Sequence, residues 1–238
     1  AHVSKASVGQ FGVLTFVIEE ARIEAVVIEG LKRTREEVVR RELTVQPGAL
    51  FEEKKVARDI QKVFNLGIFK NVSSDIRPGI KDPQRGIIVV VVIEEKRTGQ
   101  ASVAGGYSSL DGFVLVLAVS ENNFRGRGER ASANLELFGR TSYEVSFFEP
   151  YVDRKGSSVS VRVYDTERRR RFVGGTSLGN TDDAFDERRS GATLSYSMPT
   201  GANTRTSLKV RSEKVSSSEY QGTRTIVPQS GGLLGSAQ

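Results

Sequence analysis

A run of seven Ile and Val residues, Ile87–Ile93, constrains the fold more than any other stretch of the chain. It is long enough to form a strand buried on both faces and too short to cross a membrane as a helix. We therefore expect it to be the central strand of a small sheet. Four charged residues, Glu94–Arg97, end the run, and Thr98 with Gly99 predicts a short hinge. Beyond the hinge a two-residue alternation begins, so two architectures meet at this point.

The residues before this run mix strands with helices. Val13–Glu19 and Ile23–Glu29 are rich in β-branched and aliphatic residues and are predicted to be strands. Thr34 and Glu37 have the spacing of a capping box, in which the hydroxyl and the carboxylate satisfy the free amides of a helix start. A first helix is therefore expected over residues 35–43.

A longer helix is expected after Phe51. Its apolar side chains recur at three- and four-residue spacing and form one stripe, made of Val56, Ile60, Val63 and Phe64. Gly67 stands where the end of that helix needs a left-handed residue. A strand at Phe69–Ile76 and the closing Ile/Val run complete the order β-α-α-β-β.

From residue 98 onward the sequence predicts only strands, because apolar and polar residues alternate. Leu135 and Leu137 alternate with Asn134 and Glu136, for example. About seven such segments occur, at residues 101–109, 113–122, 129–138, 142–150, 157–166, 190–199 and 204–213. Segments of about 9–11 residues match tilted transmembrane strands. A soluble β-sandwich or barrel with its own apolar core would show the same alternation, so the pattern alone leaves both interpretations open.

Several motifs carry a resemblance to a known family. In the first part they are Gly30, Pro47 with Gly48, the Phe51 helix, Leu66–Phe69 with Val72, and the closing run into Glu94 and Glu95. These resemble a polypeptide-transport-associated (POTRA) repeat of the outer-membrane protein assembly superfamily. That superfamily contains the BamA-type insertases and their chloroplast and two-partner-secretion relatives.

Three later motifs are similar to the barrel of the same superfamily. They are Gly105–Ser109 with Gly112, Asn123–Gly128, and Phe147–Tyr151. Two features depart from the family pattern. Arg125 stands where the family usually has an aromatic residue, and the late Val-Arg-Gly-Phe/Tyr motif is absent from the sequence. We therefore expect an incomplete barrel in this chain.

The resemblance implies an α+β POTRA repeat (β-α-α-β-β) followed by all-β antiparallel strands of an incomplete transmembrane β-barrel. Residues 1–21 would be the end of a preceding POTRA repeat, residues 22–97 a membrane-proximal repeat, and residues 98–238 the first part of the barrel with about seven strands. It assigns structural roles to the motif residues Gly30, Gly67, Gly126, Gly128, Glu149, Pro150 and Tyr151.

In the family, the strand that corresponds to residues 69–76 lies at the edge of its sheet. An exposed edge offers unpaired amides and carbonyls to which an extended client chain can add as a further strand. The alternative is that a neighbouring repeat or loop covers this edge. The expected client-binding residues are Phe69, Lys70, Asn71, Val72, Ser73, Ser74, Asp75 and Ile76.

The family's first barrel strand pairs weakly with its last strand and forms a seam that can open. Gly105 and Gly106 would weaken this strand because they have no side chains to pack. Tight strand packing or a bend would explain the two glycines equally well. The expected seam strand comprises Ala101, Ser102, Val103, Ala104, Gly105, Gly106, Tyr107 and Ser108.

Composition gives little support for an enzyme or a nucleic-acid binder. There is no Cys, and His2 is the only His. It lies in residues 1–10, which are small, polar and without a pattern and are expected to have no regular structure. The formal charge of +6 is spread evenly: residues 1–100 carry 17 Lys and Arg against 14 Asp and Glu, and residues 101–238 carry 18 against 15. Phosphate binding usually needs a concentrated patch. We expect no cofactor, no metal and no nucleic acid.

One dense basic run, Arg168–Arg171, is followed by Asp182, Asp183, Asp186 and Glu187. The arginines could bind a polyanion such as lipopolysaccharide phosphates, but a solvated loop is the simpler interpretation. The acidic residues could offer a Ca²⁺ site or simply balance the arginines, and they lack the spacing of a known cation loop.

The function implied by the resemblance is assembly and insertion of outer-membrane proteins. Expected partners are unfolded clients, outer-membrane lipid and accessory assembly subunits. The barrel would lie in an outer membrane with the POTRA repeats in the periplasm, and a plastid outer envelope remains an alternative. A two-partner-type secretion pore of the same superfamily is the nearest alternative function. A soluble β-rich module that binds a polyanion is the alternative from a different class.

Overall fold

The structure of the chain is a computed structural model, and it describes residues 2–8, 14–108, 112–139, 141–171, 184–201 and 204–219. The chain divides into two compact units. The first unit comprises Ala1–Arg97 and the short segment Arg125–Gly128, and the second comprises Thr98–Phe124 and Glu129–Gln238. No helix in the described part of the chain is long and apolar enough to cross a membrane.

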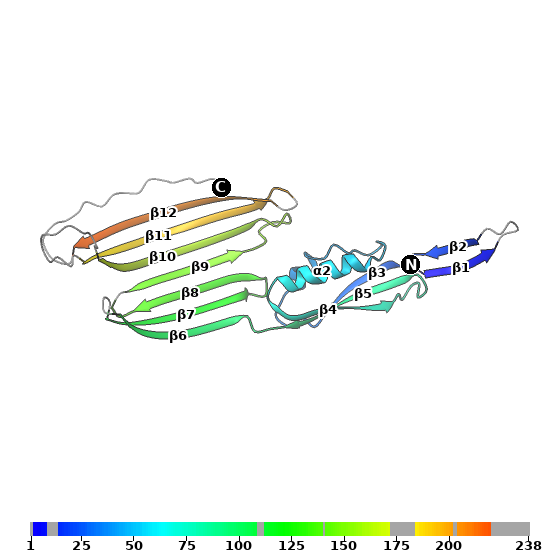
Figure 1. The fold of residues 1–238 in the computed structure, drawn as a ribbon, viewed down its shortest axis with the longest axis horizontal. Helices are drawn as coiled ribbons and strands as arrows, with labels where there is room; N and C mark the ends of the chain where they lie inside the picture. Colours follow the sequence, from blue (N-terminus) through cyan, green and yellow to red (C-terminus); the bar gives the residue numbers. More distant parts are fainter. Residues whose placement is uncertain are drawn as a thin grey trace. The chain divides into compact units, whose positions relative to one another are not determined.

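A two-stranded antiparallel sheet begins the first unit, formed by β1 (His2–Val8) and β2 (Leu14–Glu19) (Figure 1). The strand expected at residues 13–19 is confirmed. The expectation that the first residues have no regular structure is wrong, because His2 pairs with Glu19 in the strand register. A strand pairs through its backbone, so it needs no side-chain alternation to form beside a partner.

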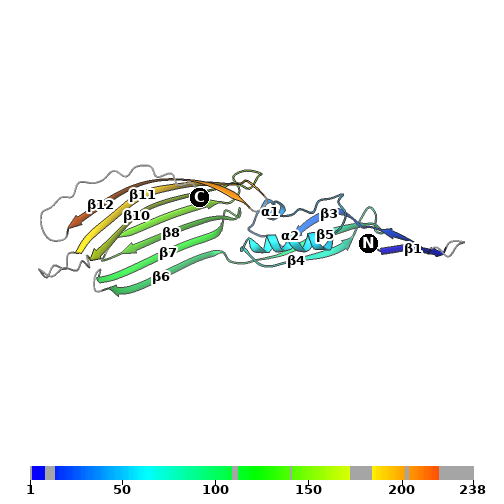
Figure 2. The same ribbon diagram turned by 45° about the horizontal axis from the view of Figure 1, so that its top comes forward.

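The main sheet of the first unit has the order β3-β5-β4, with β3 at Arg22–Glu29, β4 at Phe69–Pro78 and β5 at Gly86–Glu95. The β5 strand pairs parallel with β3 and antiparallel with β4. The Ile/Val run is therefore central, as predicted, and Val89, Val90 and Val91 are at most 1% exposed. With α1 (Glu36–Arg40) and α2 (Glu53–Asn65), the order β-α-α-β-β is also confirmed (Figure 2).

The apolar stripe of α2 builds most of one side of the core. Val56 and Val63 are buried and Ile60 packs against the cluster, but Phe64 is 44% exposed. The stripe is therefore narrower than the sequence indicated. The buried members of the core are Ile23, Val26, Val38, Val39, Val45, Val56, Val63, Ile68, Phe69, Val72, Val89, Val91 and Ile93.

The predicted capping box does not form. The residue before α1 is Arg35, and no side chain caps the helix. Instead, the Glu95 carboxylate at the end of β5 accepts hydrogen bonds from the backbone amides of Arg33 (3.0 Å) and Thr34 (2.8 Å). A tertiary partner has thus replaced the local one at the helix start. The helix is also shorter than expected, at Glu36–Arg40 rather than residues 35–43.

The second unit is a seven-stranded antiparallel sheet whose strands follow chain order from β6 to β12 (Figure 1). The sheet is not closed among the described residues, since β6 and β12 form its two edges. The strands are β6 (Gly99–Ser108), β7 (Gly112–Phe124), β8 (Glu129–Leu137), β9 (Ser142–Glu149), β10 (Ser158–Arg171), β11 (Ala184–Pro199) and β12 (Arg205–Glu219). All seven predicted strands are confirmed, and β7 and the last three are longer than predicted by three residues or more.

The alternation also places side chains as expected. Val145, Val161 and Leu194 share one face because they are opposite or diagonal partners in the register of β9, β10 and β11. They are between 39% and 52% exposed. The polar partners Glu144 and Arg162 lie on the other face. The described part of this unit therefore leaves its apolar face uncovered.

Candidate functional site

The β4 strand is the more open of the two edges of the first unit's main sheet. At the start of β3, the neighbouring segment covers the other edge: the Ile23 amide donates to the Ala49 carbonyl (2.9 Å), and the Gly48 amide donates to the Ile23 carbonyl (2.7 Å). Among the described residues, β4 pairs only with β5. The prediction that this strand lies at a sheet edge is confirmed; its binding of clients stays a prediction.

The predicted β4 residues divide into anchors and exposed positions. Phe69 and Val72 are buried in the core and fix the strand in place. The other predicted positions are exposed, namely Lys70, Asn71, Ser73, Ser74, Asp75 and Ile76. Ile76 is 48% exposed, so the edge also offers an apolar contact.

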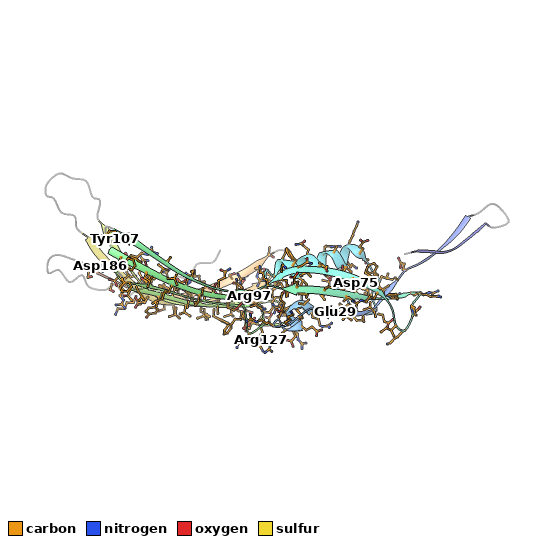
Figure 3. The ribbon with its side chains drawn as sticks, turned by 90° about the horizontal axis from the view of Figure 1, so that it is seen from below. Glu29, Asp75, Arg97, Tyr107, Arg127 and Asp186 are labelled. Carbon is orange, nitrogen blue, oxygen red and sulfur yellow. The ribbon has the colours of Figure 1, made fainter. Side chains whose placement is uncertain are left out.

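Ion pairs satisfy the charges that flank this edge. The Lys70 ammonium donates to Glu94 (2.6 Å), and this hydrogen bond raises the pKa of Lys70. The Arg77 guanidinium donates to Glu29 (2.8 Å) and Asp75 (3.1 Å), which raises its pKa, the Glu29 bond contributing most. Glu29 on β3 and Asp75 on β4 are marked in Figure 3. With these charges paired, the outer backbone groups of β4 remain the main polar feature of the edge.

The β6 strand is an edge of the second unit's sheet and pairs only with β7 among the described residues. Residues Ala101–Tyr107 are exposed, with Val103 at 73% and Tyr107 at 81%. Tyr107 is labelled in Figure 3. Ser108 belongs to the strand by its backbone. The predicted seam strand is thus an edge strand; its role as a seam stays a prediction.

The two glycines of β6 are not explained by close packing. A Cβ atom at Gly105 would lie 3.6 Å from the Phe113 ring, which is an ordinary contact, and one at Gly106 would meet nothing within 4 Å. Neither glycine has a left-handed φ. The described residues therefore leave room for a side chain at both positions.

An apolar hollow of about 680 Å³ lies beside the start of β6. Ala101 from β6, Val119 and Phe124 from β7, and Ala131 and Phe147 from the next two strands line it. Phe124 and Phe147 meet edge to face, with ring centroids 6.4 Å apart. The edge strand and this hollow together present backbone pairing groups next to an apolar surface.

The glycines of the structural motifs adopt the conformations that the motifs require. Gly30, Gly67, Gly126 and Gly128 all have left-handed φ values between +72° and +94°. A Cβ atom at Gly30 would lie 2.0 Å from the Ile93 carbonyl oxygen. Two features therefore require glycine at position 30: the left-handed φ of the turn and the close approach of the Ile93 backbone.

The segment Arg125–Gly128 packs within the first unit. The Arg35 amide donates to the Gly126 carbonyl (2.8 Å), and a Cβ atom at Gly126 would lie 2.1 Å from the Arg33 carbonyl oxygen. Arg125, which replaces the family's usual aromatic residue, itself has a left-handed φ of 56°.

In the third motif, the Glu149 carboxylate accepts the Tyr151 amide (3.1 Å), and this bond spans Pro150 at the end of β9.

The basic run lies in a strand, so the solvated-loop interpretation is wrong. Residues 168–171 continue β10, and they pair with Ala184–Glu187 of β11. Arg168 is opposite Glu187 and Arg169 is opposite Asp186, so pairing with β11 extends the strand past the predicted end at residue 166. Asp182 and Asp183 of the calcium hypothesis lie outside the described residues. Within the described ranges, no group of three or more His, Asp or Glu side chains is arranged to hold a metal ion.

Sequence reasoning missed two buried or half-buried carboxylates that organise the first unit. Asp59 on α2 is 1% exposed and accepts hydrogen bonds from the amides of Thr44 (2.6 Å) and Val45 (3.0 Å). Glu95 holds the Arg33 and Thr34 amides. Burial raises the pKa of Glu95, but the hydrogen bonds from Thr34 and Arg33 outweigh it and leave the pKa below its usual value. The one sign in the sequence that Asp59 is buried was its position: it lies on the same face of α2 as the apolar residues Val56 and Val63.

Two family models match the chain. The POTRA family, described as "Surface antigen variable number repeat", matches residues 21–96, and the "Omp85 superfamily domain" matches residues 123–231. The first match covers the β-α-α-β-β fold of the first unit, and the second covers most of the seven-stranded sheet.

Curated relatives and solved structures agree with these matches. "Outer membrane protein assembly factor BamA" of Neisseria meningitidis is 32% identical over 58% of this chain and 17% of its own length. The BamA of Nitratidesulfovibrio vulgaris is 28% identical over 79% of this chain and 22% of its own length. "Outer envelope protein 80, chloroplastic" of Arabidopsis thaliana is 25% identical over 79% of the chain and 28% of its own length. The chain thus spans a quarter or less of the bacterial relatives it matches.

Two solved structures share the fold. BamA from Haemophilus ducreyi lacking POTRA domains 1–3 aligns with a TM-score of 0.62 at 18% identity, over 89% of this chain and 40% of that one. CdiB from Acinetobacter baumannii aligns with a TM-score of 0.53 at 17% identity, over 88% and 40%. The open seven-stranded sheet therefore corresponds to part of a barrel.

Proposed function

Because the chain belongs to the Omp85 superfamily of outer-membrane proteins, we propose that it is part of an outer-membrane protein assembly factor. The observation that carries the proposal is the pair of open strand edges, β4 in the first unit and β6 in the second. Membership of the superfamily locates the sheet in an outer membrane and the POTRA unit in the periplasm; plastid outer-envelope proteins are among its relatives. It also favours the transmembrane interpretation over a soluble polyanion-binding module.

Receipt of clients is assigned to β4. An unfolded outer-membrane protein arrives as an extended chain whose backbone groups need partners, and the outer edge of β4 offers a row of them. The contacting residues are those of Phe69–Ile76. The buried Phe69 and Val72 hold the strand still, while exposed Ser73 and Ser74 leave space for a chain to approach.

Insertion is assigned to β6. In lipid an unpaired strand edge leaves its backbone groups without water, so pairing with a client strand is strongly favoured there. Gly105 and Gly106 add no side-chain packing that would hold a resident partner. The apolar hollow beside β6 provides a surface against which the client strand's apolar side chains can pack.

We further propose that this activity involves no covalent catalysis and no cofactor, because strand pairing and apolar burial supply the driving force. The partners are unfolded outer-membrane proteins, outer-membrane lipid on the apolar face, and accessory assembly subunits.

The insertion step is tested by replacing both Gly105 and Gly106 with Val in the full-length protein. The described residues leave room at both positions, so the variant should fold and remain in the membrane. We expect client assembly into vesicles to slow several-fold, because Val side chains stabilise pairing of β6 with its resident partner. A matched control places two Val residues at Ser190 and Ala192 in the interior strand β11, which lines neither the β6 edge nor the apolar hollow. Assembly at the unmodified rate by the Gly105/Gly106 variant would contradict the insertion role.

Receipt of clients at β4 is tested with Ser73→Pro and Ser74→Pro. Successive amides of a strand point to opposite edges, so one variant removes an amide bonded to β5 and the other removes an outward amide. The variant that keeps the normal thermal unfolding of the first unit is the outward one. We expect it to lose most of its crosslinking to an unfolded client, and crosslinking at the normal level would contradict the assignment.

Secretion of a partner protein is a second candidate, supported by the fold shared with CdiB. It predicts that Gly105→Val with Gly106→Val leaves transport unchanged, because a secreted chain passes through the barrel without pairing with its wall strand. The same variant therefore separates the two functions.

A further inference from the structure

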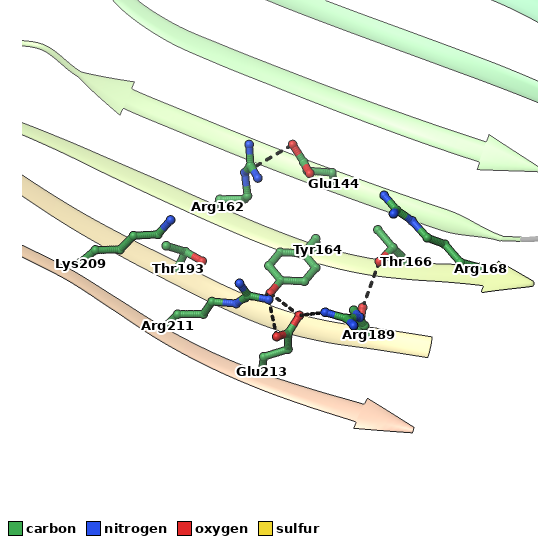
Figure 4. Close-up of a pocket in the computed structure, with 10 residues that line it drawn as sticks. All are labelled: Glu144, Arg162, Tyr164, Thr166, Arg168, Arg189, Thr193, Lys209, Arg211 and Glu213. Carbon is green, nitrogen blue, oxygen red and sulfur yellow. Dashed lines mark hydrogen bonds and ion pairs between the residues drawn. The ribbon is translucent and has the colours of Figure 1, made fainter. Parts of the chain in front are cut away.

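The polar face of β9–β12 contains a charged cavity of about 260 Å³ (Figure 4). Two carboxylates, Glu144 and Glu213, line it together with five cations. The cations are Arg162, Arg168, Arg189, Lys209 and Arg211. The cavity therefore carries a net charge of +3, out of +6 for the whole chain. This is a local concentration of charge that the even division between the two halves of the sequence concealed.

Tyr164 forms the fixed centre of the cavity. It is opposite Gly191 in the register, and a Cβ atom at that glycine would lie 3.0 Å from the Tyr164 hydroxyl. The missing side chain lets the ring lie across β11. The Tyr164 hydroxyl then donates to Glu213 on β12 (3.0 Å) and accepts from Arg211 Nε (3.1 Å). Side chains thus join β10 and β12 across β11 at this position.

Most of the charges are already paired. Arg211 forms an ion pair with Glu213, Arg189 lies 3.9 Å from the same carboxylate, and Arg162 lies 3.5 Å from Glu144. Arg189 also pairs with Glu187, the residue opposite Arg168.

Two cations stand apart. Arg168 and Lys209 form no ion pair with any residue in the described ranges, and in Figure 4 they lie on opposite sides of the Tyr164 centre. The positive charge that is available to a ligand therefore sits at two separate points.

The separation of these two points sets the shape of the ligand. Lys209 is level with Ser195 on β11 and with Ser160 on β10, and Arg168 is eight positions farther along β10. At about 3.4 Å per residue this offset is about 27 Å between backbones. Both side chains extend inward into the same cavity, so their charged groups lie closer together than the backbones do (Figure 4). One phosphate still cannot contact both cations, but an extended segment of about five to eight residues can.

We propose that this face binds an extended acidic polypeptide segment, with one carboxylate at Arg168 and another at Lys209. A guanidinium binds a carboxylate through two parallel hydrogen bonds, which suits Arg168. The hydroxyls of Tyr164, Thr166 and Thr193 line the space between the two points.

A polyphosphate or nucleic acid fits less well. Such a chain carries a charge at every unit and would place negative charges beside Glu144 and Glu213. A polypeptide can carry carboxylates at its two ends only. The site is separate from the β4 and β6 edges and goes beyond the proposed function.

The experiment measures binding of fluorescent peptides to the full-length protein in neutral detergent. The peptides are extended and about ten residues long, with two Glu residues between five and eight positions apart, and each control carries Gln at both positions. We expect the Glu peptide to bind more tightly, and binding to weaken as salt is added. The double variant Arg168→Gln with Lys209→Gln should weaken binding roughly fivefold to tenfold.

A matched charge control is Lys214→Gln. Lys214 is also on β12 and exposed, but it lies on the opposite face of the sheet from Lys209. We expect Lys214→Gln to leave binding unchanged. The inference is overturned if the double variant binds the Glu peptide normally, if Lys214→Gln weakens binding equally, or if the Gln peptide binds as well. Displacement of the Glu peptide by inorganic phosphate at equal concentration would also overturn it.

Discussion

In the first unit the fully buried side chains are mostly aliphatic and pack between the sheet and its helices, whereas the buried side chains in the described part of the second unit are polar. Val63, Val89 and Val90 are completely buried in the first unit. In the second unit the buried residues include Glu129 and Asp165, while valines such as Val161 are exposed. Valine therefore fills the buried core of the first unit but forms an exposed apolar face in the second.

This difference shows where each sheet obtains its stability. On one face of β5, Val89, Val91 and Ile93 belong to the core that the first unit supplies for itself. On the other face Val90 is also buried, whereas Val92 is 37% exposed. Apolar and polar residues alternate along β10 because one face of the strand is polar and the other is apolar. No described residue covers the apolar face. On a transmembrane barrel, the outward apolar face is the lipid-facing surface.

The largest expected effect is at Gly30 in the first unit. Gly30→Ala should cost about 3–5 kcal/mol and prevent stable folding, because the new Cβ atom would meet the Ile93 carbonyl at 2.0 Å and φ is +94°. Gly67→Ala is the matched control, since φ is +72° there but nothing lies within 4 Å. We expect it to cost only about 1 kcal/mol. Urea unfolding of both variants measures the difference, and equal losses would refute the role of the close approach.

The next effect tests the outward apolar face directly. Val161→Arg should destabilise the folded protein in lipid vesicles by about 2–4 kcal/mol, because it places a charge on the lipid face. Ser160→Arg, at the adjacent position on the polar face, should cost far less. Unfolding in urea, followed by heat-dependent gel mobility, reports both values. A soluble sheet with a solvated Val161 would tolerate the two changes equally.

A smaller effect concerns Glu95 and pH. Its pKa in the folded state lies below the usual 4.5, so its contribution to stability is fully present above pH 4.5 and is lost as the pH falls through the lower folded value. Glu95→Gln should cost about 1–2 kcal/mol at pH 7 and make the stability of the first unit less sensitive to acid.

The control for Glu95 is Glu37→Gln. Glu37 would matter if the predicted capping box existed, but α1 has no side-chain cap. We expect its replacement to change stability by less than about 0.5 kcal/mol. A larger loss for Glu37→Gln than for Glu95→Gln, in chemical denaturation between pH 3 and pH 7, would contradict this account of the helix start.

The sequence predicted most of the architecture because periodicity reflects burial. The run at residues 87–93 identified the central strand, and the alternation beyond residue 98 identified seven strands. It failed where a distant partner decides the local structure. Glu95 replaced the Thr34 capping box, and β11 extended β10 through the basic run at residues 168–171.

Of the candidate sites, the sequence predicted the two strand edges but not the charged cavity. The edge positions of β4 and β6 followed from the family resemblance, but the cavity around Tyr164 did not. Its members come from β9, β10, β11 and β12, and only the register brings them together. Continuing the alternation past Val163 would have placed Tyr164 on the polar face beside Arg162, which is the one signal that the sequence contained.

The central claim is that the edge of β6 pairs with a client strand during assembly, and disulfide trapping tests it most directly. One full-length variant carries Ala104→Cys in β6, and the matched variant carries Ala192→Cys in the interior strand β11, away from the apolar hollow. Each is mixed with an unfolded outer-membrane protein that has single Cys residues along one strand. We predict disulfide-linked adducts at Ala104 with alternate client positions and none at Ala192. Absence of adducts at Ala104 during successful assembly, or equal adducts at both positions, would contradict the account.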